Sequence, residues 1–164
     1  MAIILLQLFA FEAKYSSQSE NEFIVFSKQK NTIITERHGN KVILYSNYCI
    51  LKNASEDLTL KSYLVANFCK IQHKKPLTNV LYFKNKKILI MDSTAVYLQD
   101  EKPDILLLTH SPKLNLERLL VSWKPKQVVV NGTNFKTYIK VWKATCRKEK
   151  IPFHDTAEKG FFKL

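Results

Sequence analysis

The sequence of 164 residues predicts an α/β fold, in which a mixed β-sheet carries helices on at least one face. Three observations lead to this prediction. Segments with strand-like apolar patterns precede one helical segment, and from residue 105 onward apolar strands alternate with amphipathic helices. Hydrophobic residues make up 46% of the chain and charged residues 24%, as in ordinary folded domains. Glycine and proline are scarce, at 3 and 5 residues, so the composition does not favour disorder.

Residues 2–11, AIILLQLFAF, form an uncharged and mostly apolar segment at the start of the chain. A membrane span needs roughly 20 such residues. The segment also lacks the preceding positive charge and the following small-residue cleavage site of a secretory signal. Two interpretations stay open: a first core strand or helix, or the trailing end of a transmembrane helix. We therefore distinguish a lead-in over residues 1–15 from a single domain over residues 16–164.

The first half of the domain predicts strands followed by one helix. Three segments between residues 21 and 47 alternate apolar and polar residues, and each predicts a strand. They are residues 22–27, 32–37 and 41–46. The sequence HGN at residues 38–40 predicts the turn of a hairpin. Residues 55–72 have the apolar spacing of a helix packed on a sheet, with Ser55 as its N-cap.

The second half predicts a hairpin and then alternating strands and helices. Residues 79–93 predict the hairpin, which turns at residues 84–87. Two continuous apolar segments predict strands buried on both faces, and each precedes an amphipathic helix. The strands are residues 105–109 and 127–130, and the helices are residues 115–123 and 134–150. Residues 151–164 predict two short closing strands.

The two buried strands end in the loops THSPKLN (residues 109–115) and NGTN (residues 131–134). Loops beyond the carboxyl ends of strands are where α/β sheets usually place their sites. Metal-dependent hydrolases of the metallo-β-lactamase type carry a histidine cluster such as HxHxDH at such a strand end. The cluster is needed because the metal ions require several fixed nitrogen and oxygen ligands to acidify a bridging water.

Only the first position of that histidine pattern is occupied here. When the pattern is laid on the chain from His110, Pro112, Leu114 and Asn115 stand where the other ligands belong. One ligand of four does not hold a catalytic metal, and the chain also lacks P-loop, GxGxxG and GxSxG patterns. The sequence therefore predicts no metal and no cofactor. His110 and Asp92 are candidate ligands only under an alternative, a metal-dependent nuclease or phosphodiesterase with an unorthodox site.

The three cysteines, Cys49, Cys69 and Cys146, lie far apart and form no CxxC or CxxH pattern. This arrangement is neither a disulfide framework nor a zinc site. All three have apolar or helical neighbours, so we expect buried and unreactive thiols.

The formal net charge of +12 favours an anionic partner, either nucleic acid or an anionic membrane surface. A general solubility charge is the alternative. The charge is concentrated late in the chain, because residues 113–150 contain ten basic residues and two acidic ones. This concentration favours a binding surface in that region.

The predicted helix over residues 134–150 carries the sharpest charge pattern. Its apolar residues recur at helical spacing and should face the core. They are Phe135, Ile139, Trp142 and Cys146. One position further along each time lies a basic stripe without an acidic residue, formed by Lys136, Lys140, Lys143, Arg147 and Lys150. A solvated helix face usually mixes charges, so the stripe predicts contacts to a phosphate backbone, with Lys113 and Lys126 as secondary contacts.

Several stretches between residues 80 and 163 together resemble the C-terminal tail of ComEC-type competence proteins, the DNA-translocation channels of natural transformation. The similarity is to the truncated variant that lacks the metal motif. The stretches are SPK and ER within residues 111–118, KPK at 124–126, NGTN at 131–134 with the following YIKVW, and IPFH at 151–154 with EKG.

The resemblance implies a truncated, degenerate metallo-β-lactamase-like fold and makes residues 1–11 the end of a transmembrane helix. It implies a non-catalytic domain of an inner-membrane DNA-uptake channel, facing the periplasm. Its partners would be DNA, single- or double-stranded and without sequence specificity, the transmembrane channel portion of the same protein, and the inner membrane. Besides the nuclease, a bracing domain whose charge meets acidic lipid is the remaining alternative.

Overall fold

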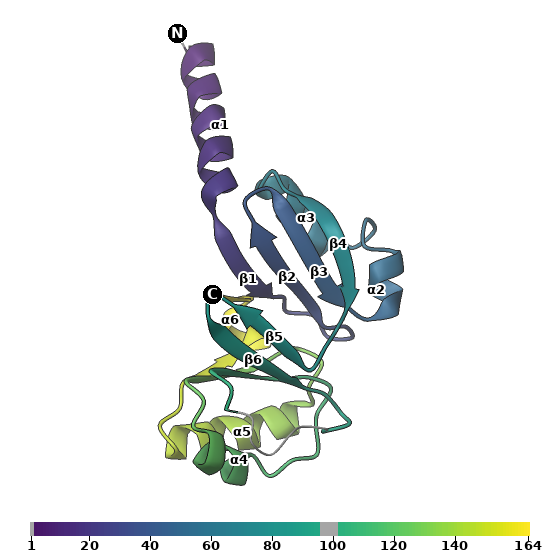
Figure 1. Cartoon of the computed structure of the whole chain (residues 1–164), viewed down its shortest axis with the longest axis vertical. Helices are drawn as coiled ribbons and strands as arrows, with labels where there is room; N and C mark the ends of the chain where they lie inside the picture. Colours follow the sequence, from purple (N-terminus) through teal and green to yellow (C-terminus); the bar gives the residue numbers. More distant parts are fainter. Residues whose placement is uncertain (1, 96–101) are drawn as a thin grey trace. The chain divides into compact units, whose positions relative to one another are not determined.

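The computed structural model describes residues 2–95 and 102–164. The chain divides into two compact units: unit 1 is Met1–Ile24, Ile34–Pro76 and Leu164, and unit 2 is Val25–Ile33 and Leu77–Lys163. The predicted mixed α/β fold is confirmed, but its strands form two mixed sheets instead of one (Figure 1). The predicted lead-in over residues 1–15 and the single domain after it stay predictions, because compactness does not establish independent folding.

In unit 1, four strands lie in the order β1-β2-β3-β4. Their bounds are β1 (Asn21–Val25), β2 (Ile33–His38), β3 (Lys41–Ser46) and β4 (Lys70–Pro76). The first three confirm the predicted strands, and the turn between β2 and β3 lies at residues 39–40, as predicted. β4 pairs with β3 in parallel. Leu164 exchanges two backbone hydrogen bonds with Phe23, of 3.2 and 3.0 Å. A short helix, α2 (Tyr48–Lys52), was not predicted.

The helix predicted over residues 55–72 is wrong at both ends. The helix found there, α3 (Leu58–Ala66), has Asp57 and not Ser55 as its N-cap. Phe68 adopts a φ of 51°, which ends the helical path shortly before β4 begins. β4 was not predicted, because its sequence, KIQHKKP, does not alternate apolar and polar residues. Its strand conformation depends on backbone pairing with β3, which a local pattern does not reveal.

The chain starts with α1 (Ala2–Ser19), which Figure 1 shows as one unbroken helix. Its large apolar side chains are between 55% and 75% exposed, so it is not the core element that one interpretation predicted. These side chains include Ile3, Ile4, Leu5, Leu6, Leu8, Phe9, Phe11 and Tyr15. Within the described part of the chain, no helix combines the length and the apolar character that crossing a membrane requires.

In unit 2, the sheet has the strand order β5-β6-β7-β8-β9. The bounds are β5 (Val80–Phe83), β6 (Lys86–Met91), β7 (Ile105–Leu108), β8 (Gln127–Val130) and β9 (Phe153–Asp155). β5 and β6 form the predicted hairpin, whose turn residues Lys84 and Asn85 both have positive φ. The remaining neighbours pair in parallel, so the carboxyl ends of β6 to β9 lie at one edge.

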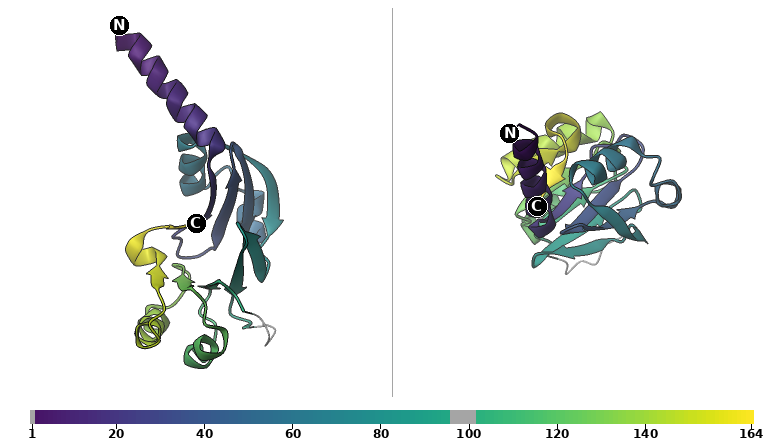
Figure 2. Two further views of the ribbon diagram at one scale, coloured as in Figure 1. Left: turned by 60° about the vertical axis from the view of Figure 1, so that its left-hand side comes forward. Right: turned by 90° about the horizontal axis from the view of Figure 1, so that it is seen from above.

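The helices α4 (Leu116–Trp123) and α5 (Lys136–Lys148) connect the parallel strands and lie next to each other (Figures 1 and 2). Asn115 caps α4 by accepting a 3.0 Å hydrogen bond from the amide of Arg118. Both helices bury their apolar faces in one core. That core includes Leu106, Leu108, Val128 and Val130 from the sheet, Leu120 and Trp123 from α4, and Ile139, Trp142 and Cys146 from α5. The chain ends with α6 (Thr156–Lys159) and β10 (Phe162–Lys163).

Two expectations about burial are wrong. Phe135, expected in the core, is 68% exposed, because it is the extended N-cap residue of α5 and does not follow the helical spacing. Cys49 is exposed, whereas Cys69 and Cys146 are buried as expected. Burial raises the pKa of the Cys146 thiol to about 12, which keeps it protonated and unreactive at neutral pH.

Candidate functional site

The loops that follow β7 and β8 are joined to each other by hydrogen bonds. The amide of His110 donates to Thr133 Oγ1 at 2.8 Å, and the amide of Ser111 donates to Asn134 Oδ1 at 2.7 Å. The amide of Phe135 in turn donates to Ser111 Oγ at 2.7 Å. His110 and Ser111 both adopt positive φ, of 55° and 54°, to make these bonds. The THSPKLN loop is therefore held in place by the start of α5.

The NGTN loop uses its own polar side chains for structure. Asn134 Nδ2 donates to the carbonyl of Leu108 at 2.7 Å, and Asn131 Nδ2 donates to Thr32 Oγ1 at 2.8 Å. Position 132 requires glycine, because the Cβ of any other residue would lie 2.7 Å from the carbonyl oxygen of Lys28. The polar residues at this sheet edge thus satisfy one another, as buried polar groups must.

The two candidate metal ligands, His110 and Asp92, do not belong to a cluster of metal-binding side chains among the described residues. His110 is exposed at the end of β7. Asp92, at the end of β6, accepts hydrogen bonds of 2.9 and 2.6 Å from the amide and hydroxyl of Thr94. Among the residues that the structure describes, no three His, Cys, Asp or Glu side chains gather closely enough to hold a metal ion. The alternative metal site therefore finds no additional ligand in the described chain.

The basic stripe lies on α5, whose 13 residues include five basic residues and no acidic one. At about 100° per residue, four of them fall within about 60° of the helix circumference. These four residues, which we call the basic face, are Lys136, Lys140, Lys143 and Arg147, and all are exposed. The predicted stripe is therefore present over most of its length.

Lys150 departs from this stripe. It follows the C-cap Glu149 with a φ of 55°, and its amide donates to the carbonyl of Arg147 at 3.2 Å. The amide of Ile151 donates to the carbonyl of Cys146 at 2.9 Å, which completes a Schellman motif. Lys150 thus lies beyond the helix and does not continue its spacing.

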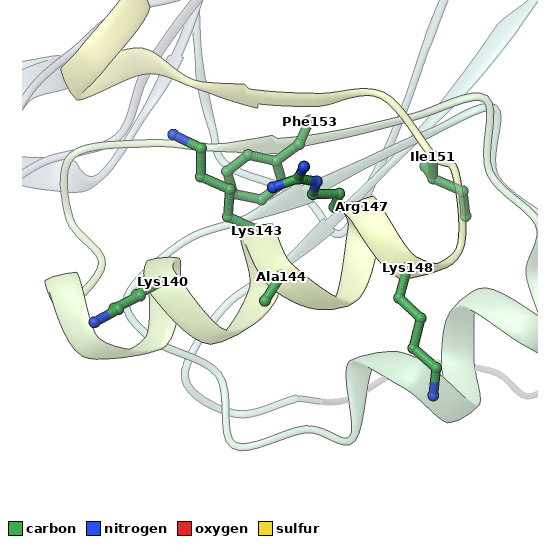
Figure 3. A pocket seen from close by; sticks show the side chains of 7 residues that line it. All are labelled: Lys140, Lys143, Ala144, Arg147, Lys148, Ile151 and Phe153. Carbon is green, nitrogen blue, oxygen red and sulfur yellow. The ribbon is translucent and has the colours of Figure 1, made fainter.

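An open groove of about 810 Å³ runs along the basic face (Figure 3). Figure 3 shows Lys143 and Arg147 on the side of α5 that is nearest Phe153, whereas Lys140 and Lys148 point away from that ring. Ala144, Ile151 and Phe153 add apolar surface to the lining of the groove. The groove therefore combines separated cations with an uncharged surface.

Some predicted contact residues already have acidic partners. Lys143 Nζ lies 2.6 Å from Glu158 Oε2, and this hydrogen bond lowers the pKa of the Glu158 carboxyl. Lys126 Nζ lies 2.9 Å from Asp104 Oδ1, and lowers the pKa of that carboxyl in the same way. Lys113 is exposed in the loop before α4.

The remaining cations of the basic face are not paired with acids. In the described chain, no carboxylate lies within ion-pair distance of Lys136, Lys140 or Arg147. These three residues can take an anionic ligand without first releasing a carboxylate. Sequence reasoning could not find this difference, because Glu158 and Asp104 lie far from their lysines along the chain.

The fold and the basic face together define a mixed α/β domain with one strongly cationic helix and, among the described residues, no histidine cluster at its strand ends. The ComEC C-terminal domain family model matches residues 23–164, so the chain belongs to this family. Membership indicates a role in competence DNA uptake, as part of an inner-membrane protein that handles DNA. The resemblance of residues 80–163 to a ComEC-type C-terminal domain is confirmed, and the match extends through most of unit 1. No curated protein matches the sequence.

Proposed function

We propose that this chain is a non-catalytic domain of a competence DNA-uptake channel, and that the basic face of α5 binds the phosphate backbone of incoming DNA. The observation that carries the proposal is the set of three exposed cations without acidic partners, Lys136, Lys140 and Arg147, on one side of one helix. Contacts of this kind position a polyanion but do not read its sequence. The domain would guide DNA regardless of its sequence.

The loops at the strand ends support a non-catalytic role. The fold keeps the strand-loop-helix order of a metal hydrolase at β7 and α4, and we interpret it as a degenerate metallo-β-lactamase-like domain. Ser111 and Asn134 are engaged with each other across the two loops. Pro112 and Leu114 add no ligand. We therefore assign the polar groups at this edge a structural role, which is to hold the two loops together.

The exposed apolar side chains of α1 support a position at the membrane. The start of α1 carries large apolar side chains at the consecutive positions 3–6, and a helical segment that is apolar on all sides is normally buried in protein or lipid. We propose that α1 is the end of a transmembrane helix of the channel in the inner membrane, and that the domain lies on the periplasmic side of that membrane. The transmembrane channel portion would then be its partner in the same protein.

The test replaces two cations of the basic face, in the double variant Lys140→Glu/Arg147→Glu. DNA affinity should fall, and its logarithm should depend less steeply on the logarithm of salt concentration. For duplex DNA the magnitude of this negative slope should become smaller by about 1.8, because each lost phosphate contact removes about 0.9 from it. The measurement is fluorescence anisotropy of a labelled duplex over a salt series, in mild detergent because α1 is apolar.

The matched control is Lys52→Glu/Lys61→Glu, which changes the net charge equally at two exposed helical lysines of unit 1. This control should leave the slope unchanged. Equal slopes in the two double variants would contradict a specific role of α5. Binding to vesicles with acidic lipid but not to DNA would support a bracing domain instead. Cleavage of DNA with Mn²⁺ or Zn²⁺ that disappears in His110→Ala would overturn the non-catalytic assignment.

A further inference from the structure

A second cavity, of about 620 Å³, borders the amino-terminal half of α5 in unit 2. Phe135, Ile139 and Ala157 contribute its apolar surface. Lys136, Lys140 and Lys143 supply cations around that surface, and Lys140 and Lys143 also line the groove of Figure 3. The basic face is thus flanked by two adjoining hollows, of which this one contains an exposed aromatic ring.

The position of Phe135 is not explained by helix stability. It occupies the N-cap of α5, where Ser, Thr, Asp or Asn would accept a hydrogen bond from the first turn, and α5 has no side-chain cap. A ring that is 68% exposed also contributes little to the core. Positions that break a local rule are expected at functional or strained sites.

The ring is nevertheless held in a defined place. The amide of Phe135 donates to Ser111 Oγ at 2.7 Å, which joins it to the loop after β7. Its ring centroid lies 6.4 Å from that of Tyr138, with a tilt of 37°, and Tyr138 lies 5.5 Å from Trp142 of the core. Phe135 is therefore the exposed end of a row of aromatic rings anchored in the core.

The carboxylates that line this cavity are already engaged. Asp155 is buried and accepts a 2.9 Å hydrogen bond from the amide of Ala157. Glu158 is paired with Lys143. Lys136 and Lys140 therefore leave a net positive charge beside the ring, which suits a ligand that is flat and apolar on one part and anionic on another.

We propose that this cavity binds an unpaired base of a single DNA strand, stacked on Phe135, while Lys136 and Lys140 contact the adjacent phosphates. The inference rests on the proposed function and specifies the form of DNA that the basic face prefers. Every base has a flat π surface, so stacking on an aromatic side chain tolerates any sequence. In a duplex the bases are stacked on one another and paired, so the ring adds affinity only for single strands.

The test compares Phe135→Ala with Phe161→Ala in the full 164-residue chain. Phe161 is a matched control, because it is also exposed, at 56%, and lines neither of the two cavities. Anisotropy would be measured with labelled oligothymidylate of about 12 nucleotides and with a hairpin duplex. Phe135→Ala should weaken single-strand binding about 10-fold and leave duplex binding unchanged. Phe135→Trp should preserve single-strand binding, since indole offers a larger stacking surface.

The outcomes separate this inference from the proposed function. If Lys140→Glu/Arg147→Glu weakens binding of both DNA forms but Phe135→Ala changes neither, the stacking site is wrong and the phosphate-binding face stands. If Phe135→Ala weakens single strands and duplex equally, stacking of an unpaired base is again contradicted. If neither variant changes any affinity, the proposed function itself fails. Thermal unfolding of each variant checks that the fold is intact, and the exposure of Phe135 leads us to expect an unchanged midpoint for its variants.

Discussion

Replacing Glu158 by glutamine should strengthen the binding of DNA by α5 and make it more sensitive to salt. In the unchanged protein, Glu158 neutralises Lys143 at 2.6 Å, which leaves Lys136, Lys140 and Arg147 for phosphates. Glu158→Gln removes the carboxylate charge and adds Lys143 to that set. The substitution is isosteric and lies on an exposed side chain, so the fold of unit 2 should be unaffected.

The expected size of the effect follows from the number of phosphate contacts. Three contacts to duplex DNA predict a slope of about −2.7, and four predict about −3.6. Between roughly 50 and 200 mM salt, affinity should therefore fall about 40-fold for the unchanged protein and about 150-fold for Glu158→Gln. Lowering the pH to 5 would not neutralise Glu158 as the glutamine substitution does. Because Lys143 lowers the pKa of Glu158 below its usual value, the carboxylate is still charged at pH 5.

The assay is the same anisotropy salt series, with Glu56→Gln as the control. Glu56 is an exposed glutamate in unit 1, so its substitution changes the net charge equally but does not release a cation on the basic face. Its slope should match that of the unchanged protein. A slope for Glu158→Gln equal to that of the control, or a lower affinity at low salt, would refute the reasoning that Lys143 is withheld from DNA by its carboxylate.

Two further predictions concern stability. Glu22 is buried, 3.1 Å from Arg37 Nε, and accepts a 2.7 Å hydrogen bond from the Tyr63 hydroxyl. Glu22→Gln should reduce the free energy of unfolding by about 3 kcal/mol, because it leaves a buried cation without its nearest counter-charge. Urea denaturation measures this, and a loss no larger than that of Glu20→Gln, whose carboxylate is half-exposed and 3.9 Å from Arg37, would contradict it. Lys150→Gly should stabilise the chain by about 1 kcal/mol, since glycine adopts positive φ without strain. Thermal unfolding would show this as a higher midpoint, and an equal gain in the alanine variant at this position would argue against backbone strain as the cause.

Local patterns were sufficient for most of unit 2. Continuous apolar segments predicted β7 and β8 because a strand buried on both faces needs apolar residues at every position. The spacing of Ile139, Trp142 and Cys146 predicted the buried side of α5, since a helix returns to the same face every three or four residues. Asn115, at the start of the predicted helix over residues 115–123, is its N-cap residue, and a cap of this kind bonds only to its own neighbourhood.

Local patterns failed where a residue leaves the regular element to which its spacing assigns it. Phe135 continues the apolar spacing of α5 in the sequence, yet it lies outside the helix in extended backbone and is exposed. Lys150 continues the basic spacing, yet positive φ takes it off the helix. In both cases the helix is shorter than its side-chain pattern: α5 begins at Lys136, one residue after Phe135, and ends at Lys148, two residues before Lys150. Hydrogen bonds of the flanking residues hold both ends.

By itself, the sequence determined that this chain is a mixed α/β protein with one basic helix, an incomplete histidine pattern and a resemblance to ComEC tails. These properties depend on residue types and on short-range spacing. Only the tertiary structure decided which cations are available, because Glu158 and Asp104 reach their lysines from distant positions in the chain. It also decided that β4 is a strand and that Phe135 lies exposed beside the basic face. Pairing between distant segments depends on how the chain returns to itself, and no local pattern records that path.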